Sequence, residues 1–386
     1  MLHLLENNAD TMSKLFDYSK IAEGGHFVGR EDEIKRLSTD FIFLTNTALL
    51  APQGWGKSSL VHVAAKEARH KEKNIRFCFV DLSNVRNEER FYELLVQGVL
   101  KAVSDNQQEV VDNVRKYFPH TSPRVSFDVS GSFAVDFDWE EIRQNQDELL
   151  DLPFCVAKAT GYKVVVCIDE FNSISLFSDP EALLDRFRMR WPRQDGVAYC
   201  VSSTPIALTE KFLKSSPMFY RYGNIMYLNH IRRQDVVKSI REKFADGAKY
   251  LDNEVAGLIA ELVGDHAFYT QQLAHLSWLG TSVVCSKEVV MQAHETIVDQ
   301  MELVFRNITD SLTTQQLCYL HAVLAGETVI STSEVLHRHH ISSATSASRS
   351  KVSLLDRGIV CNVGGKICFA DPVYAFWLKS RYFVKK

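Results

Sequence analysis

The stretch that decides the fold is APQGWGKSS, residues 51–59. An apolar run at 48–51 leads into it, and a helical pattern follows it to about residue 70. Its Gly-Lys-Ser triplet matches the last three positions of the phosphate-binding consensus G-x-x-x-x-G-K-[ST], whereas Ala51 stands where the first glycine is usual. A strand, a glycine loop and a helix in this order predict a loop that binds phosphate.

The chemistry of this loop follows from its residue types. Gly54 and Gly56 let the backbone wrap closely, so the amides of residues 54–59 can point inward, at the positive end of the following helix. We expect Lys57 to bridge a β- and a γ-phosphate and the Ser58 hydroxyl to hold Mg²⁺. A chance glycine turn is the alternative, and the flanking strand and helix argue against it. The loop's predicted nucleotide-binding residues are Gln53, Gly54, Trp55, Gly56, Lys57, Ser58 and Ser59.

A second motif supports the first. VVVCIDE, residues 164–170, is an apolar run that ends in two carboxylates, as in a Walker B strand. At the carboxyl end of a parallel strand beside the loop, Asp169 would lie in the outer coordination shell of Mg²⁺ and Glu170 would polarise the attacking water. Either motif alone is common in ordinary proteins. The two in this order, about 110 residues apart, predict ATP binding.

Hydrolysis also needs a group that positions the water or the γ-phosphate. The apolar run 197–201 ends in Ser202-Ser203-Thr204, and of these hydroxyls we expect Thr204 to serve. The alternative is a cap on a following helix, since Pro205 comes next.

The alternation of elements indicates the fold class. Continuous apolar strands near 48–51, 75–82, 164–168 and 197–202 are separated by helical segments, which predicts an α/β fold with a parallel sheet covered by helices on both faces. Alternating apolar residues around Gly131 predict an inserted β-hairpin near 124–137.

The carboxy-terminal part is predicted to be mostly helical. Four helices between 233 and 307 indicate a helical lid, and three short helices with a β pair turning at Gly364-Gly365 indicate a winged helix-turn-helix domain. The expected organisation is a helical lead-in at 1–25, a P-loop nucleotide-binding domain at 26–231, a lid at 232–308 and the winged helix at 309–386.

The composition excludes several classes of protein. With 386 residues, 46% of them hydrophobic and 24% charged, the chain is neither disordered nor collagen-like. No stretch reaches the about 20 apolar residues of a membrane span, and the first residues, MLHLLENNADTMSK, place acidic residues where a signal peptide has a basic head. We therefore expect a soluble, cytoplasmic protein with no membrane partner.

The eight cysteines contain no C-x-x-C pair, and several lie in apolar runs, so we expect reduced core thiols and no zinc site. Cys361 and Cys368 can face each other across a hairpin, but a reducing compartment argues against a disulfide. His337, His339 and His340 share no face with a nearby acidic ligand, which argues against a metal site.

The charge is distributed unevenly. The whole chain carries a net charge of -4, but the residues from 310 onward carry nine Lys/Arg and five Asp/Glu. A recognition helix would fall near 344–355, so duplex DNA is one candidate partner. A protein-interaction or packing role is the alternative. The candidate phosphate contacts are Arg349, Lys351, Arg357 and Lys366.

Further segments resemble a known family. These are FVGRE at 27–31, IDEFN at 168–172, SPMFYR at 216–221 and FADPVYAFWL at 369–378. With the two motifs above, they look like the archaeal-type ATPases of the STAND branch of the AAA+ P-loop NTPases. The resemblance covers residues 25–380, and the two Walker motifs are its specific part.

The resemblance implies further roles. Val28 and Gly29 would line the adenine pocket, unless the segment is only a turn into a helix. Arg221 would act as an arginine finger on the γ-phosphate, unless it is a solvated surface residue. Residues 264–269 fall where the family has a glycine and a proline that packs on the nucleotide, and here Ala267 stands in place of that proline. Tyr220 also departs from the family, which more often has glycine there.

We therefore interpret the chain as an ATP-binding and ATP-hydrolysing switch that couples nucleotide state to a lid and a winged helix, acting on an unidentified protein partner or signal. A second interpretation is a DNA-binding AAA+ ATPase resembling the archaeal origin-recognition initiators. Initiators place an arginine in the lid, and residues 264–272 contain none, which favours the first. A third is a nucleotide-locked scaffold, against which Glu170 argues.

Overall fold

The structure is a computed structural model that describes residues 15, 16, 18, 20–118, 123–204 and 223–385. The chain forms two compact units. The first, here called the sheet unit, comprises residues 30–51 and 57–228. The second, here called the helical unit, comprises the residues up to 29, residues 52–56 and residues 229–386.

The sheet unit is built on a five-stranded parallel sheet with the strand order β2-β5-β6-β1-β7. Its strands are β1 (Thr47–Leu50), β2 (Ile75–Asp81), β5 (Lys163–Asp169), β6 (Val197–Ser203) and β7 (Asn224–Tyr227). Strands β1, β5 and β6 are apolar nearly throughout and buried, as a sheet covered on both faces requires. The edge strand β7 is an addition to the elements expected from the sequence.

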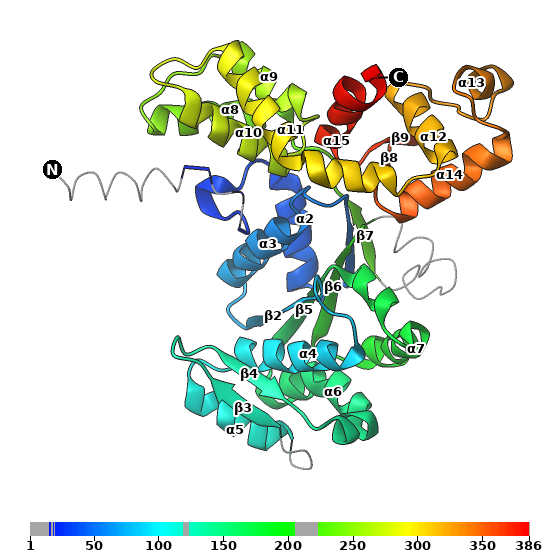
Figure 1. Cartoon of the computed structure of the whole chain (residues 1–386). Helices are drawn as coiled ribbons and strands as arrows, with labels where there is room; N and C mark the ends of the chain where they lie inside the picture. The colour runs from blue at the N-terminus through cyan, green and yellow to red at the C-terminus, as the bar shows by residue number, and fades with distance from the viewer. Residues whose placement is uncertain (1–14, 17, 19, 119–122, 205–222, 386) are drawn as a thin grey trace. The chain divides into compact units, whose positions relative to one another are not determined.

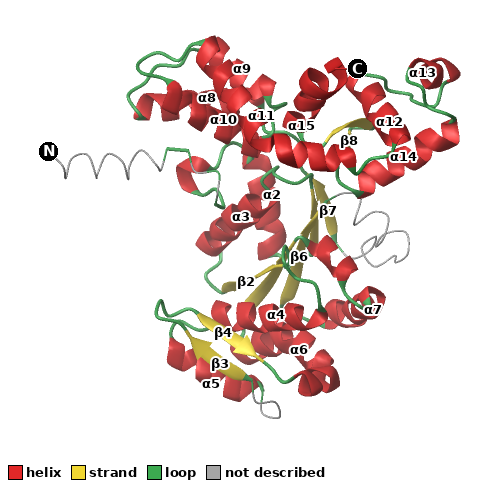
Figure 2. Ribbon diagram, in the orientation of Figure 1, coloured by secondary structure: helices red, strands yellow, loops and turns green. Residues whose placement is uncertain are grey.

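Helices cover both faces of this sheet (Figures 1 and 2). Successive residues of β2 show the two faces: the ring of Phe77 lies 5.2 Å from that of Phe41 in α2, whereas the Cys78 thiol lies 3.8 Å from the Leu95 carbonyl in α4. The helices of the unit are α2 (Glu31–Ile42), α3 (Lys57–Lys71), α4 (Glu88–Ala102), α5 (Gln107–Tyr117), α6 (Trp139–Thr160) and α7 (Pro180–Arg190).

An antiparallel hairpin, β3 (Arg124–Phe127) and β4 (Phe133–Asp136), interrupts the strand and helix alternation. Strand β4 packs on α4, and Val135 is buried in the same core as Phe118. The Asp128 carboxylate accepts amide hydrogen bonds from Ser130 and Ser132 and so shapes the turn between the strands.

The helical unit buries its apolar residues in one continuous core. Its helices are α8 (Arg233–Asp246), α9 (Asn253–Leu262), α10 (Ala267–Gly280), α11 (Lys287–Asp310), α12 (Thr314–Leu324), α13 (Ser333–Arg338), α14 (Ala344–Asp356) and α15 (Pro372–Trp377). A two-stranded ribbon, β8 (Val360–Val363) and β9 (Lys366–Phe369), turns at Gly364 and Gly365, both of which have positive φ.

The eight cysteines all lie in the described ranges, and none of them is joined in a disulfide. Cys361 and Cys368 are cross-strand neighbours in the β8-β9 ribbon, with their sulfur atoms 3.3 Å apart. Cys155 differs from the expected buried thiols, because it is exposed on α6. None of the helices in the described ranges combines the length and the apolar composition needed to cross a bilayer.

Candidate functional site

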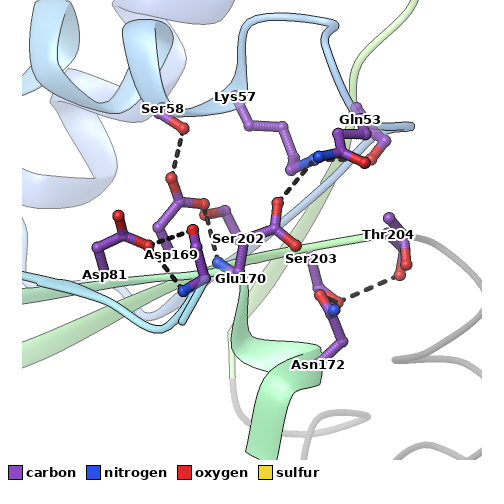
Figure 3. A network of polar contacts seen from close by, with 12 residues as sticks. Gln53, Lys57, Ser58, Asp81, Asp169, Glu170, Asn172, Ser202, Ser203 and Thr204 are labelled. Carbon is purple, nitrogen blue, oxygen red and sulfur yellow. Dashed lines mark hydrogen bonds and ion pairs between the residues drawn. The ribbon is translucent and has the colours of Figure 1, made fainter. Parts of the chain in front are cut away.

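Lys57 begins α3 and is only 5% exposed. Its Nζ donates a hydrogen bond to the Ala51 carbonyl at 3.0 Å and lies 3.9 Å from Oε1 of Glu170 (Figure 3). Burial lowers the pKa of Lys57, and the neighbouring carboxylates of Glu170 and Asp169 act in the opposite direction. The result is a buried ammonium group held beside two carboxylates.

The loop before Lys57 needs glycine at only two of its positions. Gly54 and Gly56 have φ values of 76° and 86°, a region that other residues adopt at a cost. Ala51 is not among the residues with positive φ, and it acts through its backbone carbonyl. An alanine therefore serves where the consensus has its first glycine.

The Asp169 carboxylate joins three elements. The Ser58 hydroxyl, at the start of α3, donates to one of its oxygens, and the Ser202 hydroxyl, near the end of β6, donates to the other. The Glu170 amide also donates to this carboxylate, at 2.9 Å. Figure 3 shows Ser58 and Ser202 on opposite sides of Asp169. Hydroxyl and carboxylate oxygens are the protein ligands that Mg²⁺ prefers, so this donor set fits that ion.

Glu170 follows the last residue of β5 in a left-handed conformation, with φ 49° and ψ 45°. A non-glycine residue in this region carries strain of about 1 kcal/mol or more, and such residues gather at functional sites. The 3-10 helix Phe171–Leu176 starts immediately after it, and the Asn172 side chain accepts a hydrogen bond from the Ser203 hydroxyl at 3.1 Å.

The serines of β6 and Asn172 were not assigned these contacts from the sequence. The alternation of side chains along β6 is a signal for them, because residues 202 and 203 face opposite ways at the strand end. Thr204, the hydroxyl favoured from the sequence, follows β6, and its side chain makes no hydrogen bond to the part of the chain that the structure describes. Its role stays a prediction. Arg221 and Tyr220 lie outside the described residues.

Gln53, Gly54 and Trp55 lie in the helical unit, where they contact residues of 230–268. Gly29 lies in the same unit, with φ 62°, and a side chain there would come within 3.2 Å of Asp235 in α8. Val28 precedes it, and Ala267 is the first residue of α10. Ser59 lies in α3 of the sheet unit, next to Ser58.

The cations singled out in the tail lie on three elements. Arg349 and Lys351 are on α14, and Lys366 begins β9. Arg349 and Lys366 are exposed, and Lys351 is half-buried. Arg357 differs, because its guanidinium hydrogen-bonds Ser311 at the end of α11. His339 is buried between His321 and Glu327, and no cluster of three or more His, Cys, Asp or Glu side chains in the described ranges is arranged to hold a metal ion.

Solved structures with the same fold include three archaeal proteins. A Walker-type ATPase of Pyrococcus abyssi matches with a TM-score of 0.69 and 14% identity, over 95% of this chain and 99% of that chain. The ORC2 protein of Aeropyrum pernix, in ADPNP-ADP complexes, matches with 0.50 and 13%, over 95% and 97%. The ORC1 protein of Aeropyrum pernix, in complex with DNA, matches with 0.50 and 14%, over 93% and 94%.

At these identities the likeness establishes the fold alone. The chain shares with these structures an α/β fold with a five-stranded parallel sheet flanked by helices, and it has a helical carboxy-terminal region. No protein-family model matches the chain, and no curated protein matches its sequence.

Proposed function

We propose that this chain binds ATP with Mg²⁺ and hydrolyses it to ADP and phosphate. The observation that carries the proposal is the cluster in the sheet unit where Ser58 hydrogen-bonds Asp169 and the buried Lys57 lies beside Glu170. A lysine, a hydroxyl and two carboxylates at the carboxyl end of a parallel sheet are the groups that Mg-nucleotide binding requires.

Ser58 and Asp169 are the residues that would hold Mg²⁺. Both residues offer side-chain oxygen atoms, and the hydrogen bond from Ser58 to Asp169 keeps the two side chains together. When bound, Mg²⁺ supplies positive charge that offsets the charge of the phosphates. The Ser202 hydroxyl keeps the Asp169 carboxylate oriented from the side of β6.

Lys57 and Glu170 have separate roles in this proposal. Lys57 exchanges its present partners for the β- and γ-phosphate oxygens, since its ammonium group is already buried and has little hydration left to lose. Glu170 accepts a hydrogen bond from the attacking water and polarises it. Thr204 and Arg221 are proposed to contact the γ-phosphate, and Val28, Gly29 and Ala267 to lie on the nucleoside side.

We further propose that hydrolysis works as a STAND-type switch. Residues 26–231 form the nucleotide-binding domain, 232–308 the lid and 309–386 a winged helix, and γ-phosphate contacts change the packing of the last two. The support for a winged helix is the sequence of α12, α13 and α14 followed by the β8-β9 ribbon. The partner that reads the switch is an unidentified protein or signal.

Steady-state phosphate release from Mg-ATP tests the proposed activity, with Glu170→Gln as the blank. The substitution keeps the size of the side chain and its place beside Lys57 but removes the charge that polarises water, so we expect turnover to fall by about 100-fold or more while ATP still binds. Equal phosphate release by the wild type and Glu170→Gln would contradict the assignment of Glu170.

A DNA-binding ATPase is the second candidate. Exposed Arg349 on α14 and Lys366 on the ribbon favour it, together with the excess of basic residues from 310 onward. The same assay with duplex DNA separates the two candidates. Turnover that rises with DNA, and a rise that is lost in Arg349→Ala, would favour the initiator-like function. Slow turnover that is indifferent to DNA favours the self-contained switch.

A further inference from the structure

Residues 52–56 of the phosphate loop contact the start of α10 and the segment before α8, all within the helical unit. Nε2 of His266 lies 3.2 Å from the Gln53 carbonyl oxygen, and the Phe268 amide donates to the Gly54 carbonyl at 3.3 Å. The Trp55 ring lies 4.0 Å from that of His230. Three contacts from outside the loop therefore fix three consecutive residues.

The hydrogen bonds of His266 assign its tautomer. His266 is the N-cap of α10, and its Nδ1 accepts a hydrogen bond from the Tyr269 amide at 3.4 Å. Because Nδ1 accepts, the proton of the neutral ring is on Nε2, which then donates to the Gln53 carbonyl. Burial lowers the pKa of His266, against the charge of nearby Asp371, and so favours this neutral form.

These two contacts also set the direction of the loop amides. In a trans peptide, the C=O and the N–H of the same unit point in opposite directions. Since the Gln53 carbonyl points at His266, the Gly54 amide points away from it. Since the Gly54 carbonyl points at the Phe268 amide, the Trp55 amide likewise points away from α10. Phosphate-binding loops act through amides that are oriented in this way.

The close approach of the ring to the loop depends on Gly54. A Cβ atom on Gly54 would lie 2.4 Å from Cε1 of His266, so only glycine leaves room for the ring. His266 is buried, 6% exposed, and its ring packs against that of Tyr269, with ring centroids 5.0 Å apart. The missing side chain of Gly54 therefore leaves the space that the His266 ring occupies when it reaches the Gln53 carbonyl.

We propose that His266 is a positioning residue for nucleotide binding: its Nε2–H holds the Gln53 carbonyl outward and thereby presents the amides of Gly54 and Trp55 to the phosphates. The inference rests on the proposed function, since it assigns a role in binding the same nucleotide. His266 does not touch the phosphates in this account. It acts through the loop backbone.

Two substitutions separate this role from simple helix capping. Asparagine is a good N-cap, so His266→Asn keeps the cap on α10 but is too short to reach the Gln53 carbonyl. His266→Ala loses both the cap on α10 and the contact with the Gln53 carbonyl. His275→Asn, on the same helix and away from the loop, is the matched control. The measurements are the dissociation constants of Mg-ATP and Mg-ADP and the melting temperature of the nucleotide-free protein.

We expect both His266 variants to bind Mg-ATP and Mg-ADP about 10-fold more weakly than the wild type, the loss of one buried hydrogen bond. The melting temperature should fall in His266→Ala and recover in His266→Asn, and His275→Asn should bind nucleotide normally. Wild-type affinity in His266→Asn would overturn the inference, because capping alone would then explain His266.

Lys57→Ala distinguishes a failure of the positioning role of His266 from a failure of the proposed function. If the wild type binds Mg-ATP, Lys57→Ala does not, and His266→Asn binds normally, only the positioning role is overturned. If the wild type itself does not bind Mg-ATP, the proposed function is overturned, and the role of His266 with it.

Discussion

Lys57 and Lys243 are both buried residues, 5% and 6% exposed, but their surroundings differ. Lys57 has the carboxylates of Glu170 and Asp169 nearby. Lys243, in α8, has the Gln271 amide oxygen at 2.8 Å and the ring of Phe16, whose centroid lies 5.3 Å from Nζ. A neutral amide and an aromatic ring replace hydration only in part, and burial lowers the pKa of Lys243 to about 8.

This difference predicts a pH dependence of stability. Below about pH 8 both the folded and the unfolded state keep the proton of Lys243. Between about pH 8 and pH 10 the unfolded state binds more protons, so the free energy of unfolding rises with pH. Lys243→Met should be more stable than the wild type at pH 7, by on the order of 2 kcal/mol, and this advantage should shrink toward pH 10.

Urea unfolding at a series of pH values measures this effect. Lys238→Met is the matched control, because Lys238 lies on the same helix and is 77% exposed. An advantage of Lys243→Met that stays constant from pH 7 to pH 10 would show that the burial of charge is not its cause.

At the scale of the element, α10 begins at Ala267, where the resembling family has proline. The first residue of a helix needs no intrahelical partner for its amide, and proline is favoured there. His266 has φ -73° and ψ 117°, which suits a residue that precedes proline. Ala267→Pro should therefore raise the free energy of unfolding by about 0.5 kcal/mol, through the entropy of the unfolded chain.

Thermal unfolding of Ala267→Pro without nucleotide provides the measurement. The expected result is a small rise in melting temperature. A fall in melting temperature would mean that α10 cannot begin with proline in this chain, and that alanine is required there.

The local elements of the site could be predicted from the sequence, because each is encoded in a short run. The loop glycines, Lys57 and the carboxylates that end β5 all follow from residue type and order. Contacts set by tertiary packing could not be predicted. Ser202 reaches Asp169 only through the pairing of β5 with β6, and His266 meets Gln53 across 213 residues.

Edge strand β7 was missed for a different reason. It has four residues, of which only Met226 is buried, so its sequence has no pattern long enough to indicate a strand. The strand forms because its backbone pairs with β1, and its own sequence gives no indication of this.

At the scale of the molecule, the helical unit has one core for α8–α11 and for the tail. Two buried or half-buried hydrogen bonds join these parts. The Tyr269 hydroxyl of α10 donates to Asp371 at 2.7 Å, and Asp371 also caps α15 through the amides of Val373 and Tyr374. The Tyr374 hydroxyl lies 2.8 Å from that of Thr309 in α11. Hydrogen bonds therefore join the α15 segment to both α10 and α11.

Tyr269→Phe tests the first of these links. It removes the hydroxyl and leaves the ring, so the Asp371 carboxylate loses one of its donors. The helical unit should lose about 1–2 kcal/mol of stability, as expected for a hydrogen bond to a charged acceptor. Tyr250→Phe, at an exposed position of the same unit, is the control in a denaturant titration. Equal stability of Tyr269→Phe and the wild type would contradict a structural role for this bond.

A calorimetric titration of Mg-ATP into the wild type and into Lys57→Ala tests whether the cluster around Lys57 and Asp169 binds Mg-nucleotide. We expect saturable binding of one nucleotide by the wild type and an affinity at least about 100-fold weaker in Lys57→Ala, because the phosphates lose a charge-assisted contact in a buried site. Equal affinities of the two proteins for Mg-ATP would contradict this expectation.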